Sequence, residues 1–85
     1  MEFRQLQYFV AVAEEESFSR AAEKMNVSQP SLSKAIQSIE DEYGVTLVKR
    51  TTRSFKLTVA GELIFKQGEK LIDDCLLYTS DAADD

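Results

Sequence analysis

The sequence predicts a small, mainly α-helical domain, in which three helices are followed by a two-stranded hairpin and a fourth helix. Three observations favour this fold class. Apolar residues recur at helical spacing over much of residues 3–43, helix-capping residues separate these stretches, and short β-forming runs begin after Gly44. The 85 residues suffice for one such domain but not for two independent cores.

The first two helices are predicted over residues 3–16 and from about Ser17 to residue 25. Three glutamates close the first helix, where negative charge opposes the helix dipole. Ser17 or Ser19 caps the short second helix, and Asn26 tolerates the left-handed conformation of a sharp turn. A short helix, a tight turn and a longer helix make a helix-turn-helix arrangement.

The third helix, over residues 28–44, is the most informative part of the chain. Ser28 is a good N-cap, Pro30 suits the first turn, and Gly44 favours the helix end. One stripe is apolar and should be buried, namely Leu32, Ala35, Ile36, Ile39 and Tyr43. The other face carries side chains that read base edges or hold phosphates, where a merely solvated helix more often has Glu and Lys: Gln29, Ser31, Ser33, Lys34 and Gln37.

After this helix, residues 47–50 and 55–58 read as the two strands of a hairpin, or wing. Between residues 43 and 58 there is no acid, but there are four cations: Lys49, Arg50, Arg53 and Lys56. Arg53 lies at the hairpin tip and is a candidate for insertion into a narrow minor groove. The other three cations, with the hydroxyls of Ser17 and Ser19, are candidate phosphate contacts.

The last helix is predicted over residues 59–78, with Thr58 as its cap. It has more apolar surface than a core of 58 residues needs, which indicates a partner, and four residues are candidates for dimerisation: Leu63, Ile64, Leu71 and Ile72. Residues 79–85 are acidic without an apolar stripe and are expected to form a disordered tail. The chain thus divides into residues 1–58, 59–78 and 79–85.

Composition narrows the possible functions. The formal net charge is −5, but residues 1–58 hold eight basic and eight acidic residues, so the excess of acid lies in residues 59–85. The net charge therefore does not exclude binding to DNA, because the local field decides where a polyanion binds. Histidine is absent and Cys75 is the single cysteine, so no metal site, cofactor or enzyme activity is expected. No apolar run is long enough to span a membrane, and a lone cysteine suits a reducing cytoplasm.

Five spaced motifs occur in one uninterrupted order. They are L-x-x-F at residues 6–9, S-F-S-x-A-A at 17–22, S-Q-P-S-L-S at 28–33, I-x-x-L-E at 36–40 with Ile39 for the usual Leu, and R-x-x-R-x-x-x-L-T-x-A-G at 50–61. Together they resemble the N-terminal DNA-binding domain of LysR-type bacterial transcriptional regulators. Val48 departs from the family's usual Phe. The resemblance covers residues 1 to about 72, and the family's effector-binding domain is absent here.

The resemblance implies a winged helix-turn-helix that acts as a dimer on double-stranded DNA. The third helix would enter the major groove, and a small-molecule inducer would bind only in the missing effector domain. From residue chemistry, the Gln29 amide suits adenine, Pro30 suits a thymine methyl, and Lys34 suits either guanine or a phosphate. The main alternative is a winged helix that binds protein and not DNA.

Overall fold

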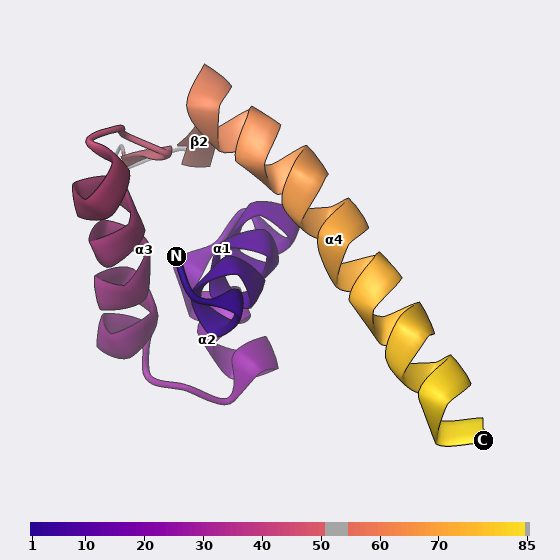
Figure 1. Ribbon diagram of the computed structural model, residues 1–85. Coiled ribbons are helices and arrows are strands. Elements are labelled where there is room, and N and C mark those ends of the chain that lie inside the picture. Colours follow the sequence, from indigo (N-terminus) through magenta and orange to yellow (C-terminus); the bar gives the residue numbers. More distant parts are fainter. Residues whose placement is uncertain (51–54, 85) are drawn as a thin grey trace.

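The computed structural model describes the backbone of residues 1–50 and 55–84, and the side chains of residues 1–49 and 55–75. Within these ranges the order of elements is α1 (Phe3–Glu15), α2 (Phe18–Met25), α3 (Gln29–Tyr43), β1 (Val48–Arg50), β2 (Phe55–Leu57) and α4 (Val59–Asp84). The predicted fold class is therefore confirmed: the domain is a mainly helical winged helix-turn-helix that continues into a long helix (Figure 1).

Each of the last three helices begins at a capping side chain. The Ser17 hydroxyl accepts a hydrogen bond from the backbone N–H of Arg20 at 3.2 Å, so Ser17 and not Ser19 caps α2. In the same way Ser28 caps α3, and the Thr58 hydroxyl accepts the N–H of Gly61 at 3.0 Å in the first turn of α4. These bonds satisfy amide groups that a helix start leaves without intrahelical partners.

The first three helices end at residues in the left-handed conformation. Gly44 (φ 65°) and Asn26 (φ 58°) do so as predicted. Glu16 (φ 52°) ends α1 in the same way, although its Cβ makes that conformation less favourable.

The core lies around α1, which contacts each of the other three helices and separates α3 from α4 (Figure 1). Phe9 and Val12 of α1 are fully buried with Leu32, Ile36 and Ile39 of α3. Tyr43 was predicted to belong to the buried stripe of α3, and this is wrong, because Tyr43 is 51% exposed. Its place in the last turn takes the ring past the core, and its hydroxyl accepts a hydrogen bond from the α-amino group of Met1 at 3.1 Å.

The hairpin is an antiparallel pair of strands with the register Val48↔Leu57, Lys49↔Lys56 and Arg50↔Phe55. Neighbouring residues of a strand point to opposite faces. Accordingly Val48 is buried, Phe55 and Leu57 pack half-buried against the core, and Lys49 and Lys56 are exposed. The predicted hairpin is confirmed for the described residues.

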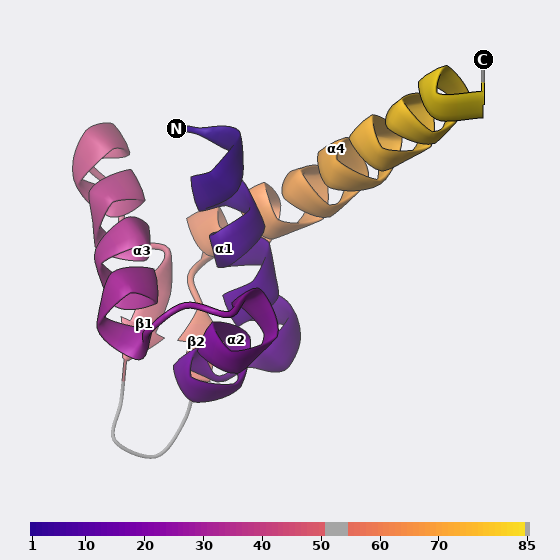
Figure 2. The same ribbon diagram turned by 90° about the horizontal axis from the view of Figure 1, so that it is seen from below.

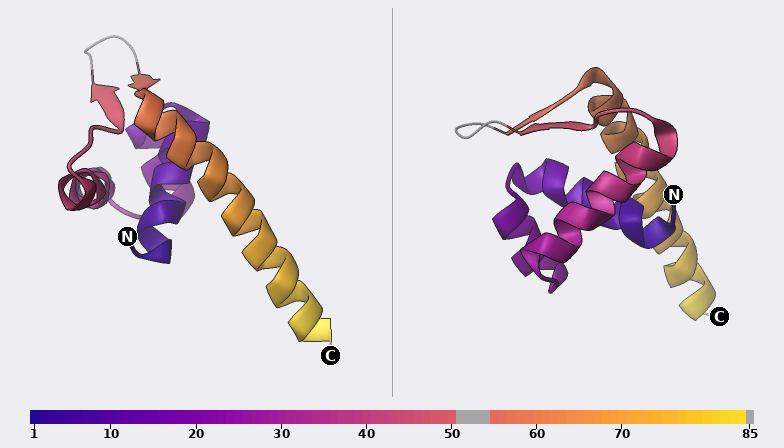
Figure 3. Two further views of the ribbon diagram at one scale, coloured as in Figure 1. Left: turned by 45° about the horizontal axis from the view of Figure 1, so that its top comes forward. Right: turned by 90° about the vertical axis from the view of Figure 1, so that its left-hand side faces the viewer.

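Helix α4 packs closely where it crosses the rest of the chain. A Cβ at Gly61 would overlap the carbonyl of Leu47, and one at Gly68 would lie 2.9 Å from Leu6 Cδ1 and 3.0 Å from Val10 Cγ2. Beyond this crossing α4 projects from the three-helix body (Figure 3, left), so the molecule measures 48 × 25 × 20 Å.

The predicted end of the last helix is wrong. Helix α4 spans Val59–Asp84, so residues 79–84 continue the helix past its predicted end at residue 78. The physical reason is local, because this segment contains no glycine or proline and includes the helix formers Ala82 and Ala83. None of the helices described is both long and apolar enough to cross a membrane.

Candidate nucleic-acid interface

One face of α3 combines exposure with side chains that can hydrogen-bond. We call it the reading face; Ser33 in it is half-buried and the other members are exposed: Gln29, Pro30, Ser31, Ser33, Lys34 and Gln37. The opposite face is fully buried at Leu32, Ile36 and Ile39. Packing of the core therefore leaves the reading face available, as the helical spacing predicts.

The first turn of α3 favours a negatively charged ligand. Its backbone N–H groups and the helix dipole give this end partial positive charge, and the turn contains no acid. The Ser28 hydroxyl donates to the Ser31 hydroxyl at 2.8 Å and accepts from the Ser31 N–H. The Ser31 side chain is thus held by the cap, while the Gln29 side chain beside it stays exposed.

Further along α3, the Gln37 amide is oriented by a neighbouring acid. Its Nε2 donates a hydrogen bond to Oδ1 of Asp41, one turn later, at 3.0 Å. The carbonyl oxygen and the second N–H of the amide stay available, and adenine needs one acceptor and one donor of this kind. The spacing of Gln37 and Asp41 in the sequence, four residues apart on one helix face, could have revealed this pair.

The hairpin adds a concentrated positive charge. Lys49 and Lys56 are directly opposed across the two strands and both are exposed. Like charges at such positions repel one another. Among the described side chains no acid forms an ion pair with either lysine or with Lys34. A phosphate near the pair would relieve this repulsion.

These parts lie on one side of the molecule. The N-terminal end of α3, α2 and the two strands point the same way, and the free end of α4 points the other way (Figure 2; Figure 3, right). At the start of α2, Ser17 is half-buried and engaged as the cap, whereas Ser19 is exposed. The side chain of Arg50, and the whole of Arg53, lie outside the described residues.

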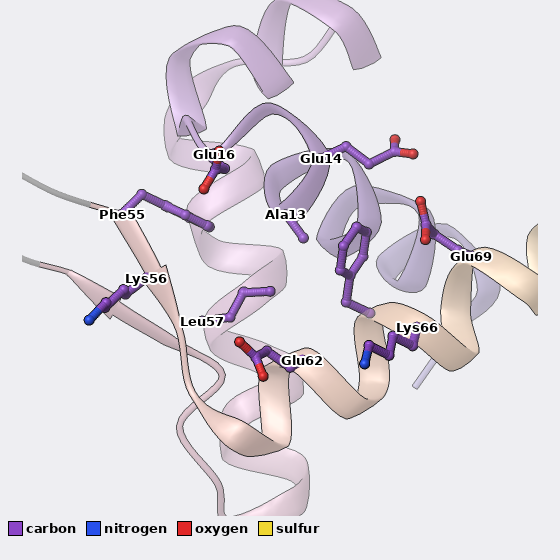
Figure 4. A pocket seen from close by; sticks show the side chains of 10 residues that line it. Ala13, Glu14, Glu16, Phe55, Lys56, Leu57, Glu62, Lys66 and Glu69 are labelled. Atoms are coloured by element: carbon purple, nitrogen blue, oxygen red, sulfur yellow. The ribbon is translucent and has the colours of Figure 1, made fainter.

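Beside the hairpin, an open hollow of about 770 Å³ lies between the end of α1, β2 and the first turns of α4 (Figure 4). Phe55, Leu57 and Phe65 give it an apolar floor. Sequence reasoning missed that four carboxylates gather around it, because they come from distant segments: Glu14, Glu16, Glu62 and Glu69.

The chemistry of this hollow is unsuited to a polyanion. Partial loss of solvent, then the carboxylates of Glu14 and Asp73, raise the pKa of Glu69 above its ordinary value. Lys56 and Lys66 also line the hollow but leave acids in excess. In the described part of the chain, no group of acidic, histidine or cysteine side chains is arranged to hold a metal ion.

The model of the bacterial regulatory helix-turn-helix proteins of the lysR family matches residues 3–62. The chain belongs to this family. The LysR-type regulator AlsR of Bacillus subtilis is 57% identical over 63 residues, which is 74% of this chain and 21% of AlsR. BenM of Acinetobacter baylyi is 45% identical over 74 residues, 87% of this chain and 24% of BenM. The chain thus spans about a quarter of the length of these curated relatives.

Solved structures of LysR-type proteins have the same fold. The BenM DBD in a complex with catB site 1 DNA superposes with a TM-score of 0.93 at 41% identity, covering 98% of this chain and 93% of that one. The CbnR DBD in a DNA complex gives a TM-score of 0.88 at 35% identity, covering 98% and 95%.

The four candidate dimerisation residues of this LysR-type domain differ in how much of each side chain is exposed. Leu63 and Leu71 are 58% and 50% exposed on α4. Ile64 packs against the chain's own core, and Ile72 is half-buried. Among the described side chains of α4, the exposed large apolar residues are Val59 at the start of the helix and then Leu63 and Leu71, which lie about two helical turns apart.

Proposed function

We propose that this LysR-type domain binds double-stranded DNA sequence-specifically, with the N-terminal half of α3 in the major groove and the hairpin on the flanking backbone and minor groove. The observation that carries the proposal is the reading face, because the N-terminal end of α3 points the same way as the two strands (Figure 3, right), and these strands carry the opposed pair Lys49 and Lys56. The similarity to BenM and CbnR domains solved in DNA complexes supports it.

Base recognition is assigned to α3. Gln29 and Gln37 suit adenine, because an amide both donates to and accepts from its major-groove edge. Pro30 suits a thymine methyl, Lys34 suits guanine or a phosphate, and the hydroxyls of Ser31 and Ser33 contribute single hydrogen bonds.

Backbone contacts are assigned to two further groups. Lys49, Arg50 and Lys56 neutralise phosphates, and Arg53 enters the minor groove. Ser17 and Ser19 face the backbone at the start of α2. For Ser17 this is a second role beside its cap, because a hydroxyl that accepts one hydrogen bond still has a proton to donate.

The domain acts as a homodimer through α4 in this proposal. One module reads only a few base pairs, and two modules at a fixed spacing read an inverted repeat. Leu63 and Leu71 form the contact, with Ile64 and Ile72 at its edge. The whole regulator is proposed to work in the cytoplasm, with an inducer bound outside this chain, since the chain matches only 21% and 24% of the two relatives named as transcriptional regulators.

Salt dependence tests the proposal. With about five phosphates neutralised per protomer, affinity for an A·T-rich duplex that holds a single half-site should fall about 500-fold between roughly 50 and 200 mM salt, and more steeply for a palindromic duplex that binds two protomers. Fluorescence anisotropy measures this directly, and competition with random DNA measures specificity. A flat salt response, or no preference over random DNA, would reject the proposal.

A protein-interaction module is the second candidate, favoured by the apolar floor and acidic rim of the hollow beside α4. The double variant Lys34→Ala/Arg53→Ala discriminates between the two. It should abolish DNA binding and leave the circular dichroism spectrum unchanged, whereas binding of a protein partner at the hollow would persist. Lys70→Ala is the matched control, because it removes an exposed cation from α4.

The relatives are regulators and not enzymes, which is why no catalytic role is proposed.

A further inference from the structure

Glu40, in the last turn of α3, holds the segment that leads into the hairpin. Its backbone carbonyl accepts hydrogen bonds from the N–H groups of Gly44 and Val45. Its carboxylate oxygen Oε2 accepts from the N–H of Leu47 at 2.6 Å and from that of Val48 at 3.3 Å. One residue therefore binds the backbone both where α3 ends and where the hairpin begins.

The contact joins the two parts of the candidate DNA interface. Gln37 lies one turn before Glu40 on α3, and Lys49 directly follows Val48 on β1. The Glu40 carboxylate is half-buried against two backbone N–H groups, so amide dipoles offset its charge. The neighbouring Asp41, by contrast, is exposed.

The Leu47 carbonyl belongs to the same peptide group as the Val48 N–H, and it is fixed to the start of α4. The Leu47 carbonyl accepts the N–H of Thr58 at 3.0 Å and the Thr58 hydroxyl at 3.3 Å, and Gly61 lies against it. The Leu47 side chain is fully buried. The start of the hairpin is thus tied to α4 and the core, while Glu40 supplies the hydrogen bonds that join it to α3 among the described residues.

We propose that Glu40 is a positioning residue for DNA binding. It fixes the hairpin relative to α3, so that Lys49 and Lys56 meet the backbone beside the bases that α3 reads. Without the carboxylate, the segment after Gly44 could turn as a hinge, and ordering it would oppose binding. This inference rests on the proposed DNA-binding function.

Salt dependence separates positioning from a purely structural role. Partial unfolding lowers the apparent affinity by the same factor at every salt concentration, so the slope of log affinity against log salt stays unchanged. Loss of the hairpin's phosphate contacts lowers the slope by about 0.9 for each phosphate.

The experiment uses the full chain and a duplex selected with it from a random library. Glu40→Ala should lower the salt slope by about two, as much as Lys49→Ala/Lys56→Ala, and the triple variant should show no further decrease. Glu40→Gln keeps an acceptor oxygen, so its salt slope should lie between the slopes of Glu40→Ala and the parent. Glu42→Gln is the matched control, because it removes the same charge from an exposed position and should keep the parental slope.

The outcomes are distinguishable. A parental slope for Glu40→Ala, or an additive decrease in the triple variant, overturns the role of Glu40. If Glu40→Ala does not fold, Glu40→Gln gives the same comparison: an intermediate slope supports positioning and a parental slope overturns it. Salt-independent binding by the parent chain contradicts the proposed function itself, not the role of Glu40.

Discussion

At the scale of single residues, Lys49 and Lys56 show a conflict between stability and function. They oppose one another across the hairpin, where like charges are unfavourable. Lys49→Glu would replace repulsion by attraction, so the free energy of unfolding should rise by up to about 1 kcal/mol. DNA affinity should fall, because a phosphate contact is lost and a negative charge is added.

Urea unfolding measures the stability change of Lys49→Glu, and fluorescence anisotropy measures its DNA affinity. Lys70→Glu on α4 is the control, with the same change of charge away from the proposed interface. An increase in stability with undiminished DNA affinity would show that Lys49 does not contact DNA.

The N-terminal amine makes stability depend on pH. Hydrogen bonds to Glu42 at 2.9 Å and Tyr43 at 3.1 Å raise the pKa of the Met1 α-amino group above its ordinary value of 8.0. The folded state therefore holds this proton more tightly than the unfolded state. The stabilisation is complete below the ordinary pKa and is lost as the pH rises through the raised pKa.

Thermal unfolding from about pH 7 to 9.5 checks this expectation. The melting temperature of the parent should fall more steeply across this window than that of Glu42→Gln, in which the main partner of the amine is weakened. Equal slopes in the two proteins would show that the amine contributes nothing to stability.

At the scale of elements, the two glycines of α4 fit its close packing differently. A Cβ at Gly61 meets the Leu47 backbone, which cannot move aside, whereas one at Gly68 meets the flexible side chains of Leu6 and Val10. Gly61→Ala should lower the free energy of unfolding by about 2 kcal/mol or more. Gly68→Ala should change it by less than about 1 kcal/mol, because alanine's helix propensity offsets the overlap.

Urea unfolding followed by circular dichroism compares the two alanine variants directly. Because both substitutions are Gly→Ala within α4, each serves as the control for the other. Equal losses would mean that the Leu47 carbonyl does not limit the approach of α4.

The elements show why part of the molecule could be predicted from its sequence. Caps such as Ser17, Ser28 and Gly44 act through bonds to near neighbours, so local sequence suffices to place them. The end of α4 was misplaced, because composition alone does not stop a helix that lacks a breaker. The contacts of Glu40 and the acidic hollow depend on tertiary packing, which helical spacing does not reveal.

At the scale of the whole molecule, charge is separated along its length. The strands of the hairpin carry two exposed lysines and no acid, whereas α4 carries six acids and two lysines. An approaching polyanion is therefore attracted to the hairpin side and repelled by the projecting helix (Figure 2). Such a dipolar distribution orients the domain on DNA without a positive net charge.

The projecting helix also predicts the state of assembly. Leu63 and Leu71 contribute little to the fold, because half or more of each side chain is exposed. Leu63→Gln/Leu71→Gln should therefore leave unfolding nearly unchanged. Removing about 1 kcal/mol per leucine in both protomers should weaken dimerisation by about 4 kcal/mol, roughly a thousandfold.

Analytical ultracentrifugation of the parent and the double variant measures this change. The control is Tyr43→Gln, which removes an equally exposed side chain on the far side of α1 and should leave the dimer intact. On DNA, the double variant should lose affinity for an inverted repeat while keeping its affinity for a single half-site, because only the repeat engages two domains. A variant that still dimerises, or that loses both affinities equally, would show that α4 does not form the dimer contact through these leucines.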